Sequence, residues 1–95
     1  MYFALVAHDR PNAVADRQRI RPEHFKFLDG LGDDLIFAGP FLNDRDEGVG
    51  SIVVIEAAGL DEARAIFGRD PYAVGGLFDS VTIKPWKLVV NKLPR

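Results

Sequence analysis

His24 is the residue whose type and surroundings most favour proton-transfer chemistry. It lies in the first turn of an expected helix and shares an apolar face with residues at spacings of three, four and seven: Phe27, Leu28 and Leu31. A half-buried neutral imidazole in such a place can accept a proton and act as a general base. The alternative is a core histidine satisfied by a neighbouring carbonyl or carboxylate. The pattern of His24 by itself favours this second interpretation.

Asp70 is the acidic residue that we expect to serve His24. Asp70 followed by Pro71 is typical of a helix start, with aspartate as the N-cap and proline in the first position. A carboxylate has two oxygens, so the same group can also orient an imidazole and stabilise its charged form. The capping role alone explains an aspartate here, and both interpretations stay open.

Two arginines precede His24 at helical spacing. If one helix continued through Pro22, then Arg17, Arg21 and His24 would share a face, although proline argues against that continuity. Two solvated surface arginines are the default interpretation. In the functional alternative, these arginines hold a carboxylate or phosphate group of a substrate.

Other reactive residues make weaker cases. His8 and Asp9 are adjacent on an expected strand and would face opposite ways, so a structural role is favoured over a dyad. Ser51 lacks the surrounding glycines of a nucleophile elbow. The two histidines have no metal-binding spacing, and the glycines at 48 and 50 precede a strand, unlike a nucleotide-binding loop. We therefore expect neither a metal nor an organic cofactor.

Composition narrows the class of protein. The chain has 95 residues and no cysteine, which favours one domain over residues 1–95 and fits a reducing cytoplasm. The net charge of −2 and the mixed charge pattern argue against a nucleic-acid partner. No apolar run is long enough to span a bilayer. We interpret the first residues as a strand and not as a signal peptide. We expect a cytoplasmic protein without a membrane or nucleic-acid partner.

The apolar periodicity predicts four strands and two principal helices. The strands are expected at Tyr2–His8, Leu35–Phe41, Ser51–Glu56 and Phe78–Leu88, and the helices run from Arg21–Pro22 to Gly32 and over Leu60–Phe67, with a short turn over residues 70–74. The polar residues 43–48 are expected to form a hairpin loop. This order predicts an α+β, ferredoxin-like βαββαβ fold, with a four-stranded antiparallel sheet and both helices on one face.

Three of these strands are apolar at consecutive positions, which makes both faces of the sheet dry. An antiparallel sheet with one solvated face should alternate apolar and polar residues, yet residues 2–7, 35–38 and 52–55 do not. Two helices can cover only one face. A second copy of the same sheet is the simplest cover for the other, so we expect a homodimer, with higher oligomers left open.

Four short motifs, taken in order, resemble the YCII-related (YciI-like) family over nearly the whole chain. They are Arg17-x-x-x-Arg21-Pro22-x-His24, Ala38-Gly39-Pro40, Asp70-Pro71-Tyr72 and Lys84-Pro85-Trp86. The resemblance implies a dimeric α+β barrel, in which two ferredoxin-like sheets pack face to face. It also implies an active site on a His–Asp pair, here His24 and Asp70.

Within the motifs of this resemblance, the residues expected to bind a substrate are Arg17, Arg21, Gly39, Pro40 and Tyr72. The expected function is a cofactor-independent enzyme acting on a small molecule by elimination, isomerisation or hydrolysis. The alternative is a non-catalytic dimer that binds a small metabolite or serves as an accessory protein. A histidine ring open to a cavity would favour the enzyme, whereas a sealed and fully satisfied ring would favour the alternative.

Overall fold

The computed structural model of the protein describes residues 1–94 and contains the expected order of strands and helices. Along the chain the elements are β1 (Tyr2–Asp9), α1 (Val14–Gly30), η1 (Gly32–Asp34), β2 (Leu35–Leu42), β3 (Gly48–Glu56), α2 (Leu60–Phe67), α3 (Pro71–Val74) and β4 (Phe78–Trp86). η1 is one turn of 3₁₀-helix that the sequence pattern does not predict. No helix in this part of the chain is long and apolar enough to cross a membrane.

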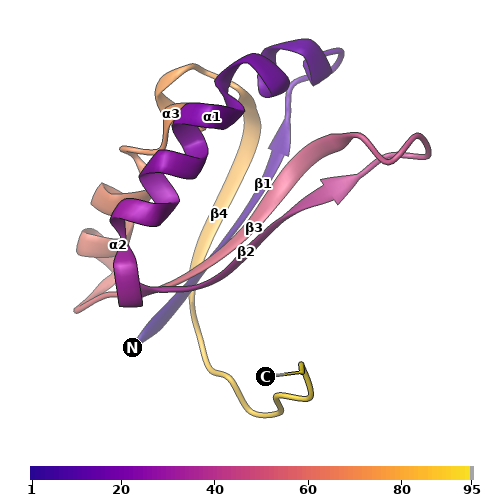
Figure 1. Cartoon of the computed structure of the whole chain (residues 1–95). Coiled ribbons are helices and arrows are strands. Elements are labelled where there is room, and N and C mark those ends of the chain that lie inside the picture. The colour runs from indigo at the N-terminus through magenta and orange to yellow at the C-terminus, as the bar shows by residue number, and fades with distance from the viewer. Residues whose placement is uncertain (95) are drawn as a thin grey trace.

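The four strands form one sheet in the order β2-β3-β1-β4, and every neighbouring pair is antiparallel. The helices lie together on one side of this sheet, as Figure 1 shows. The fold is therefore the ferredoxin-like α+β arrangement that the sequence predicts. The β2–β3 hairpin turns through residues 43–47, where the backbone N–H of Glu47 donates to the Asn43 side-chain oxygen at 3.1 Å.

The core lies between the helices and alternate residues of the two central strands. In the register of β1 and β3, Phe3 pairs with Ile55 and Leu5 with Val53. These side chains are all nearly inaccessible to solvent, and they pack with buried residues of the helices: Leu28, Ala63, Ile66 and Phe67. The periodicity that places Leu28 on the same face of α1 as His24 is thus the periodicity of the core.

The start of the first helix differs from its prediction. α1 begins at Val14 and continues through Pro22, so a start near Arg21–Pro22 is wrong. Proline removes the hydrogen bond to the carbonyl of Gln18, but Gln18 and Pro22 are both exposed and water can reach that carbonyl. The helix bends along its length, with its first turns at an angle to the rest (Figure 1).

The opposite face of the sheet has no cover among the described residues. On this face, Val54 of β3 pairs with Phe37 of β2 and with Ala4 of β1. Strand alternation brings Ile52, Val6 and Tyr2 to the same face. On this face, the large apolar side chains of Ile52 and Trp86 remain exposed. Trp86 packs edge-on against Phe37, with ring centroids 5.7 Å apart. Both faces are therefore apolar, as the strand composition predicts.

Candidate active site

His24 and Asp70 meet in the interior, where α1 packs against α3. Nδ1 of His24 lies 2.8 Å from Oδ1 and 3.0 Å from Oδ2 of Asp70. Both side chains are only 7% exposed. Because an ionised carboxylate can only accept, Nδ1 carries the hydrogen and donates it to Asp70. In the neutral ring, Nε2 is then left with its lone pair free.

Asp70 also caps α3, as its sequence context predicts. Its Oδ1 accepts the backbone N–H of Tyr72 at 2.9 Å, and Pro71 occupies the start of the helix. One carboxylate therefore holds both the helix start and the imidazole. The shared Oδ1 fixes the carboxylate in place, because the cap ties it to the backbone.

The free edge of the His24 ring opens onto a cavity. His24 and Tyr72 line a cavity of about 280 Å³ between α1 and the β2–β3 hairpin. Nε2 makes no hydrogen bond to another residue among residues 1–94. Every buried side-chain nitrogen or oxygen in that part of the chain does have a hydrogen-bond partner, so Nε2 is not fully buried. Nε2 is therefore accessible from the cavity, where a ligand could meet it.

Tyr72 fills the space between His24 and Arg17. Its ring stacks on the imidazole with centroids 4.0 Å apart and 18° between planes. The guanidinium carbon of Arg17 lies 4.4 Å from the centroid of the same ring. Arg17 and His24 are two helical turns apart, about 10 Å along the axis, and the aromatic ring separates the guanidinium from the imidazole. α3 thus positions both partners of His24, the carboxylate and the stacking ring.

Burial raises the pKa of the Tyr72 hydroxyl above its ordinary value of 10.0. Loss of hydration is the largest cause, and the negative charges of Asp70 and Asp9 act in the same direction. The positive charges of Arg17 and Arg21 oppose this rise in pKa and only reduce it. The hydroxyl consequently remains a neutral hydrogen-bond donor at neutral pH.

Arg17 is buried, so its default assignment to the solvated surface is wrong. One of its nitrogens, Nη1, donates to both carboxylate oxygens of Asp9 at 2.9 Å, and Nη2 donates to Oγ of Ser51 at 2.7 Å. The Arg17 and Asp9 side chains are 8% and 3% exposed. Gly48 leaves room for this arginine, since a Cβ there would lie 2.9 Å from Nε of Arg17. A direct substrate contact by Arg17 stays a prediction.

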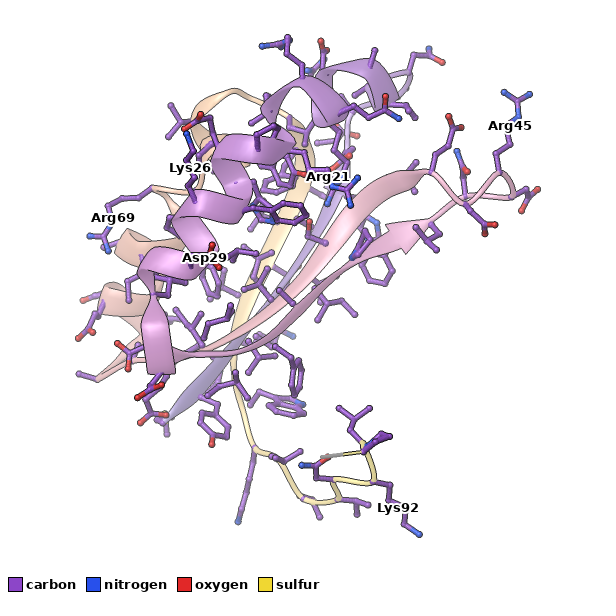
Figure 2. The ribbon with its side chains drawn as sticks, in the orientation of Figure 1. Arg21, Lys26, Asp29, Arg45, Arg69 and Lys92 are labelled. Carbon is purple, nitrogen blue, oxygen red and sulfur yellow. The ribbon has the colours of Figure 1, made fainter. Side chains whose placement is uncertain are left out.

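Arg21 lies at the mouth of the same cavity and is exposed. Figure 2 shows its side chain pointing from α1 toward the β2–β3 hairpin. The guanidinium carbon lies 5.0 Å from the centroid of the Phe25 ring, a cation–π contact. Within the described part of the chain, no carboxylate comes within 4.0 Å of Arg21. Its charge is thus available to a ligand at the entrance.

The remaining predicted binding residues line the other wall. Gly39 and Pro40 border the cavity from β2, and Asp46 and Glu47 border it from the hairpin turn. Pro40 pairs with Ser51 in the β2–β3 register. The structure therefore brings together all seven residues predicted for the site. Six of them line the cavity: His24, Arg17, Arg21, Gly39, Pro40 and Tyr72. Asp70 lies behind the imidazole of His24 and does not line the cavity.

Two residues of this cluster escaped the sequence-based selection. Asp9 and Ser51 both lie on the helix-facing side of the sheet, in register with the core positions of β1 and β3. A strict count of strand alternation from Phe3 and Ile55 would have turned both side chains inward. Their partner Arg17 could not have been identified that way. Among residues 1–94, no group of three or more His, Cys, Asp or Glu residues could hold a metal ion.

Comparison with known proteins identifies the family of this chain. A family model described as the YCII-related domain matches residues 1–87. Protein YciI of Escherichia coli is 33% identical over 97 aligned residues, which cover 94% of this chain and 99% of that protein. An uncharacterized protein of Haemophilus influenzae is 32% identical with the same coverage.

Solved structures give the same result for the fold. The 5-chloro-2-hydroxyhydroquinone dehydrochlorinase of Burkholderia phenoliruptrix, in complex with 2,5-dihydroxybenzoquinone, superposes with a TM-score of 0.84 at 28% identity, covering 92% of this chain and 94% of the other. SnoaB, a cofactor-independent oxygenase from Streptomyces nogalater, superposes with a TM-score of 0.57 at 12% identity, covering 96% of each chain. This second likeness shows the fold alone.

Proposed function

This chain belongs to the YCII-related family, and from that premise we propose that it is a small-molecule enzyme with His24 as its general base. The observation that carries the proposal is the asymmetry of the imidazole. Nδ1 is held by Asp70 at 2.8 Å, whereas Nε2 is left free at the wall of a cavity. A histidine that served packing alone would have no need for an open nitrogen beside an empty space.

Asp70 has two roles in this proposal. It fixes the tautomer that leaves Nε2 able to accept a proton, and its negative charge stabilises the imidazolium formed afterwards. The ring of Tyr72, 4.0 Å away, restricts the imidazole from the side. Such fixed geometry favours proton transfer, because the base does not have to reorient during the reaction.

The cavity volume and the arginine at its entrance support a class of substrate. About 280 Å³ accommodates a single ring or a compound of similar size. Arg21 at the entrance favours an anionic or hydroxylated group. The dihydroxybenzoquinone bound to the Burkholderia relative supports a hydroxylated six-membered ring as the first candidate. The proposed chemistry is removal of a proton followed by elimination or isomerisation, with hydrolysis as the third option.

A ligand screen followed by proton-transfer assays tests this function. Small hydroxylated or carboxylated aromatics and lactones are screened by soaking crystals and by ligand-observed NMR, and each ligand found is then assayed for elimination, isomerisation and exchange of carbon-bound hydrogen with deuterated solvent. His24→Gln should lower the rate of any such reaction by about 10²–10⁴-fold, the usual contribution of a general base. His8→Gln, which changes the histidine of the other sheet face, is the matched control.

The outcome of that assay separates the two candidate functions. An unchanged rate in His24→Gln contradicts the proposed role of this residue. Binding of ligands at His24 without any turnover in the wild-type protein favours the non-catalytic binding dimer instead, in which Asp70 and His24 form a structural pair.

We also propose that the protein works as a homodimer through the open face of its sheet. The exposed Ile52 and Trp86 support this assembly, because they belong to an apolar face that no described element covers. A second copy of the same face offers matching apolar residues, as a closed two-fold interface requires. Val89 and Val90, exposed after β4, are available to extend the contact.

The mass in solution tests the dimer. Sedimentation at micromolar concentration should give twice the chain mass of 10.5 kDa. Ile52→Glu should shift the protein to the monomer, since it places a charge in the centre of the apolar face. Ala65→Glu on the exposed side of α2 is the control and should leave the dimer intact. A stable wild-type monomer contradicts this assembly.

A further inference from the structure

Ser51 presents a hydroxyl hydrogen to the cavity. Its residue is 2% exposed and lines the cavity from β3. Oγ accepts a hydrogen bond from Nη2 of Arg17 at 2.7 Å, which occupies one of its lone pairs. Among residues 1–94, no acceptor lies in hydrogen-bonding geometry to this hydroxyl. The O–H bond is therefore directed away from Arg17 and is free to donate to a ligand.

Arg17 aims the Ser51 hydroxyl and is itself held still. Its Nη1 forms two charge-assisted bonds to Asp9, both 2.9 Å long, and this carboxylate balances the buried positive charge. The guanidinium is thus a positioning group with a fixed plane. A hydroxyl that accepts from a cation also becomes a stronger donor, because hydrogen bonds in a chain polarise one another.

Tyr72 supplies a second donor in the same cavity. Its ring lies over the guanidinium whose Nη2 donates to Ser51, so Arg17 contacts both residues. The Tyr72 hydroxyl makes no hydrogen bond within residues 1–94. Because every buried side-chain oxygen there does have a hydrogen-bond partner, this hydroxyl is not fully buried and is accessible from the cavity that Tyr72 lines. Being neutral, it can donate its hydrogen to a ligand oxygen.

We propose that Ser51 and Tyr72 form a two-donor site for a substrate oxygen that becomes negatively charged when His24 removes a proton. The inference rests on the proposed function. It adds the part of the substrate that this function does not specify: a carbonyl oxygen next to the carbon that loses its hydrogen. Neutral donors suit this task, since they stabilise a developing charge without holding a fully charged ground state equally strongly.

The step balances without any other reagent. The C–H bond beside the carbonyl breaks, and its proton passes to Nε2 of His24. The electron pair forms a carbon–carbon double bond while the carbonyl π electrons move to oxygen, giving an enolate. Ser51 and Tyr72 donate to that oxygen. In a conjugated substrate, return of the proton at the far carbon of the dienolate gives an isomer. Loss of an anionic leaving group from the carbon next to the deprotonated one gives elimination.

Binding of 4-nitrophenol tests the two-donor site independently of turnover. The phenol and phenolate forms absorb at different wavelengths, so titration with the wild-type protein gives the affinity for each. We expect the phenolate to bind more tightly than the phenol. Ser51→Ala should weaken phenolate binding about tenfold or more, which corresponds to one hydrogen bond to a charged group, and Tyr72→Phe should have a similar effect.

Matched variants separate the contributions. Ser80→Ala and Tyr2→Phe change a serine and a tyrosine outside the cavity and should leave phenolate binding unchanged. Ser51→Thr retains a hydroxyl and should preserve the preference for phenolate. Thermal unfolding of each variant shows whether a loss of binding reflects a loss of the fold.

Three results overturn the two-donor site. The first is a phenolate affinity within twofold of the wild type in both Ser51→Ala and Tyr72→Phe. The second is equal affinity of the wild-type protein for phenolate and phenol. The third is loss of the preference for phenolate in His24→Gln, because the anion would then be bound by the imidazolium. Retention of the preference in His24→Gln supports the site. Failure of His24 as a base appears separately, as turnover that survives in His24→Gln.

Discussion

Two buried acid–base pairs lie on either side of Tyr72, and they differ in what remains free. Asp9 and Arg17 are joined at 2.9 Å and Asp70 and His24 at 2.8 Å, with nearly the same burial. The guanidinium is always charged and its contacts to Asp9 and Ser51 tie it to the sheet. The imidazole can gain and lose a proton, and one of its nitrogens is free.

This difference indicates that the Asp70–His24 pair can react, whereas the Asp9–Arg17 pair can only hold neighbouring side chains in place. A permanent ion pair cannot transfer protons near neutral pH, but it fixes the orientation of neighbouring donors. A histidine paired on one side only can transfer a proton on its other side. Similar distances and burial therefore support two separate roles, and four variants test this separation.

The largest expected effect comes from Asp70→Asn. Oδ1 of the asparagine can still cap Tyr72, which places the NH₂ group against Nδ1 of His24. An NH₂ group opposes an Nδ1–H donor and can donate to Nδ1 instead, so we expect the hydrogen to move to Nε2 and the base to be lost. We expect activity to fall by about 10²–10⁴-fold, while stability changes by less than about 1 kcal/mol because the cap persists.

Nitrogen-15 NMR checks the tautomer directly, since protonated and unprotonated ring nitrogens have distinct shifts. The wild-type protein should carry the hydrogen on Nδ1 and the variant should carry it on Nε2. Asp70→Ala is the less informative change, since it removes the cap together with the charge. If the tautomer and the activity of Asp70→Asn both match the wild type, then Asp70 is a cap and nothing more.

The second effect is on stability and comes from Asp9→Ala. It leaves the Arg17 charge buried without a counterion, which should lower the free energy of unfolding by about 3–5 kcal/mol. Urea denaturation measures the change. Asp16→Ala breaks an exposed pair with Arg10 and should cost less than about 1 kcal/mol.

The exchange of both members of the buried pair supplies a further check, in case Asp9→Ala does not fold. Asp9→Leu combined with Arg17→Met replaces the ions by apolar side chains and should recover much of the lost stability. Phenolate binding should nevertheless stay weak in this double variant, because Ser51 has lost the group that aims it. Equal stability of Asp9→Ala and Asp16→Ala would contradict a structural role for the pair.

The third effect is smaller and comes from Arg17→Lys. Lysine keeps the positive charge, but its single nitrogen cannot replace both Nη1, which donates to Asp9, and Nη2, which donates to Ser51. The free energy of unfolding should fall by about 1–3 kcal/mol through the lost hydrogen bonds. The rate of reaction should fall with little change in the affinity for a neutral substrate, since only the charged oxygen needs Ser51. An equal loss of both would indicate general disorder of the cavity.

The smallest effect is a pH dependence centred on Tyr72. Because burial raises the pKa of this hydroxyl above 10.0, the folded protein keeps the proton at a pH where the unfolded chain releases it. Its contribution to the free energy of unfolding is complete below pH 10.0 and is lost as the pH rises through the folded-state pKa. Tyr72→Phe should therefore make stability less dependent on pH in urea titrations above about pH 10. Tyr2→Phe is the control, and identical slopes in the two variants would contradict this effect.

Local sequence signals were sufficient for most of the elements, for the cap at Asp70 and for the buried position of His24. Asp70–Pro71 predicts the cap and start of α3, because side-chain capping depends only on neighbouring residues. The spacing of His24 and Leu28 predicts the buried face of α1. The apolar runs of the strands predict a sheet that is dry on both faces. Each of these features is decided within a few residues of the chain.

The tertiary structure decided the rest, because it depends on distances between segments that are far apart in the sequence. Pro22 looks like a helix start, and only the exposure of Gln18 and the packing of Arg17 and His24 let the helix continue through it. Arg17 looks like a surface residue until the fold brings Asp9, Ser51 and Tyr72 around it. A charge can be buried only where partners from other elements compensate for its lost hydration, and no local pattern contains those partners.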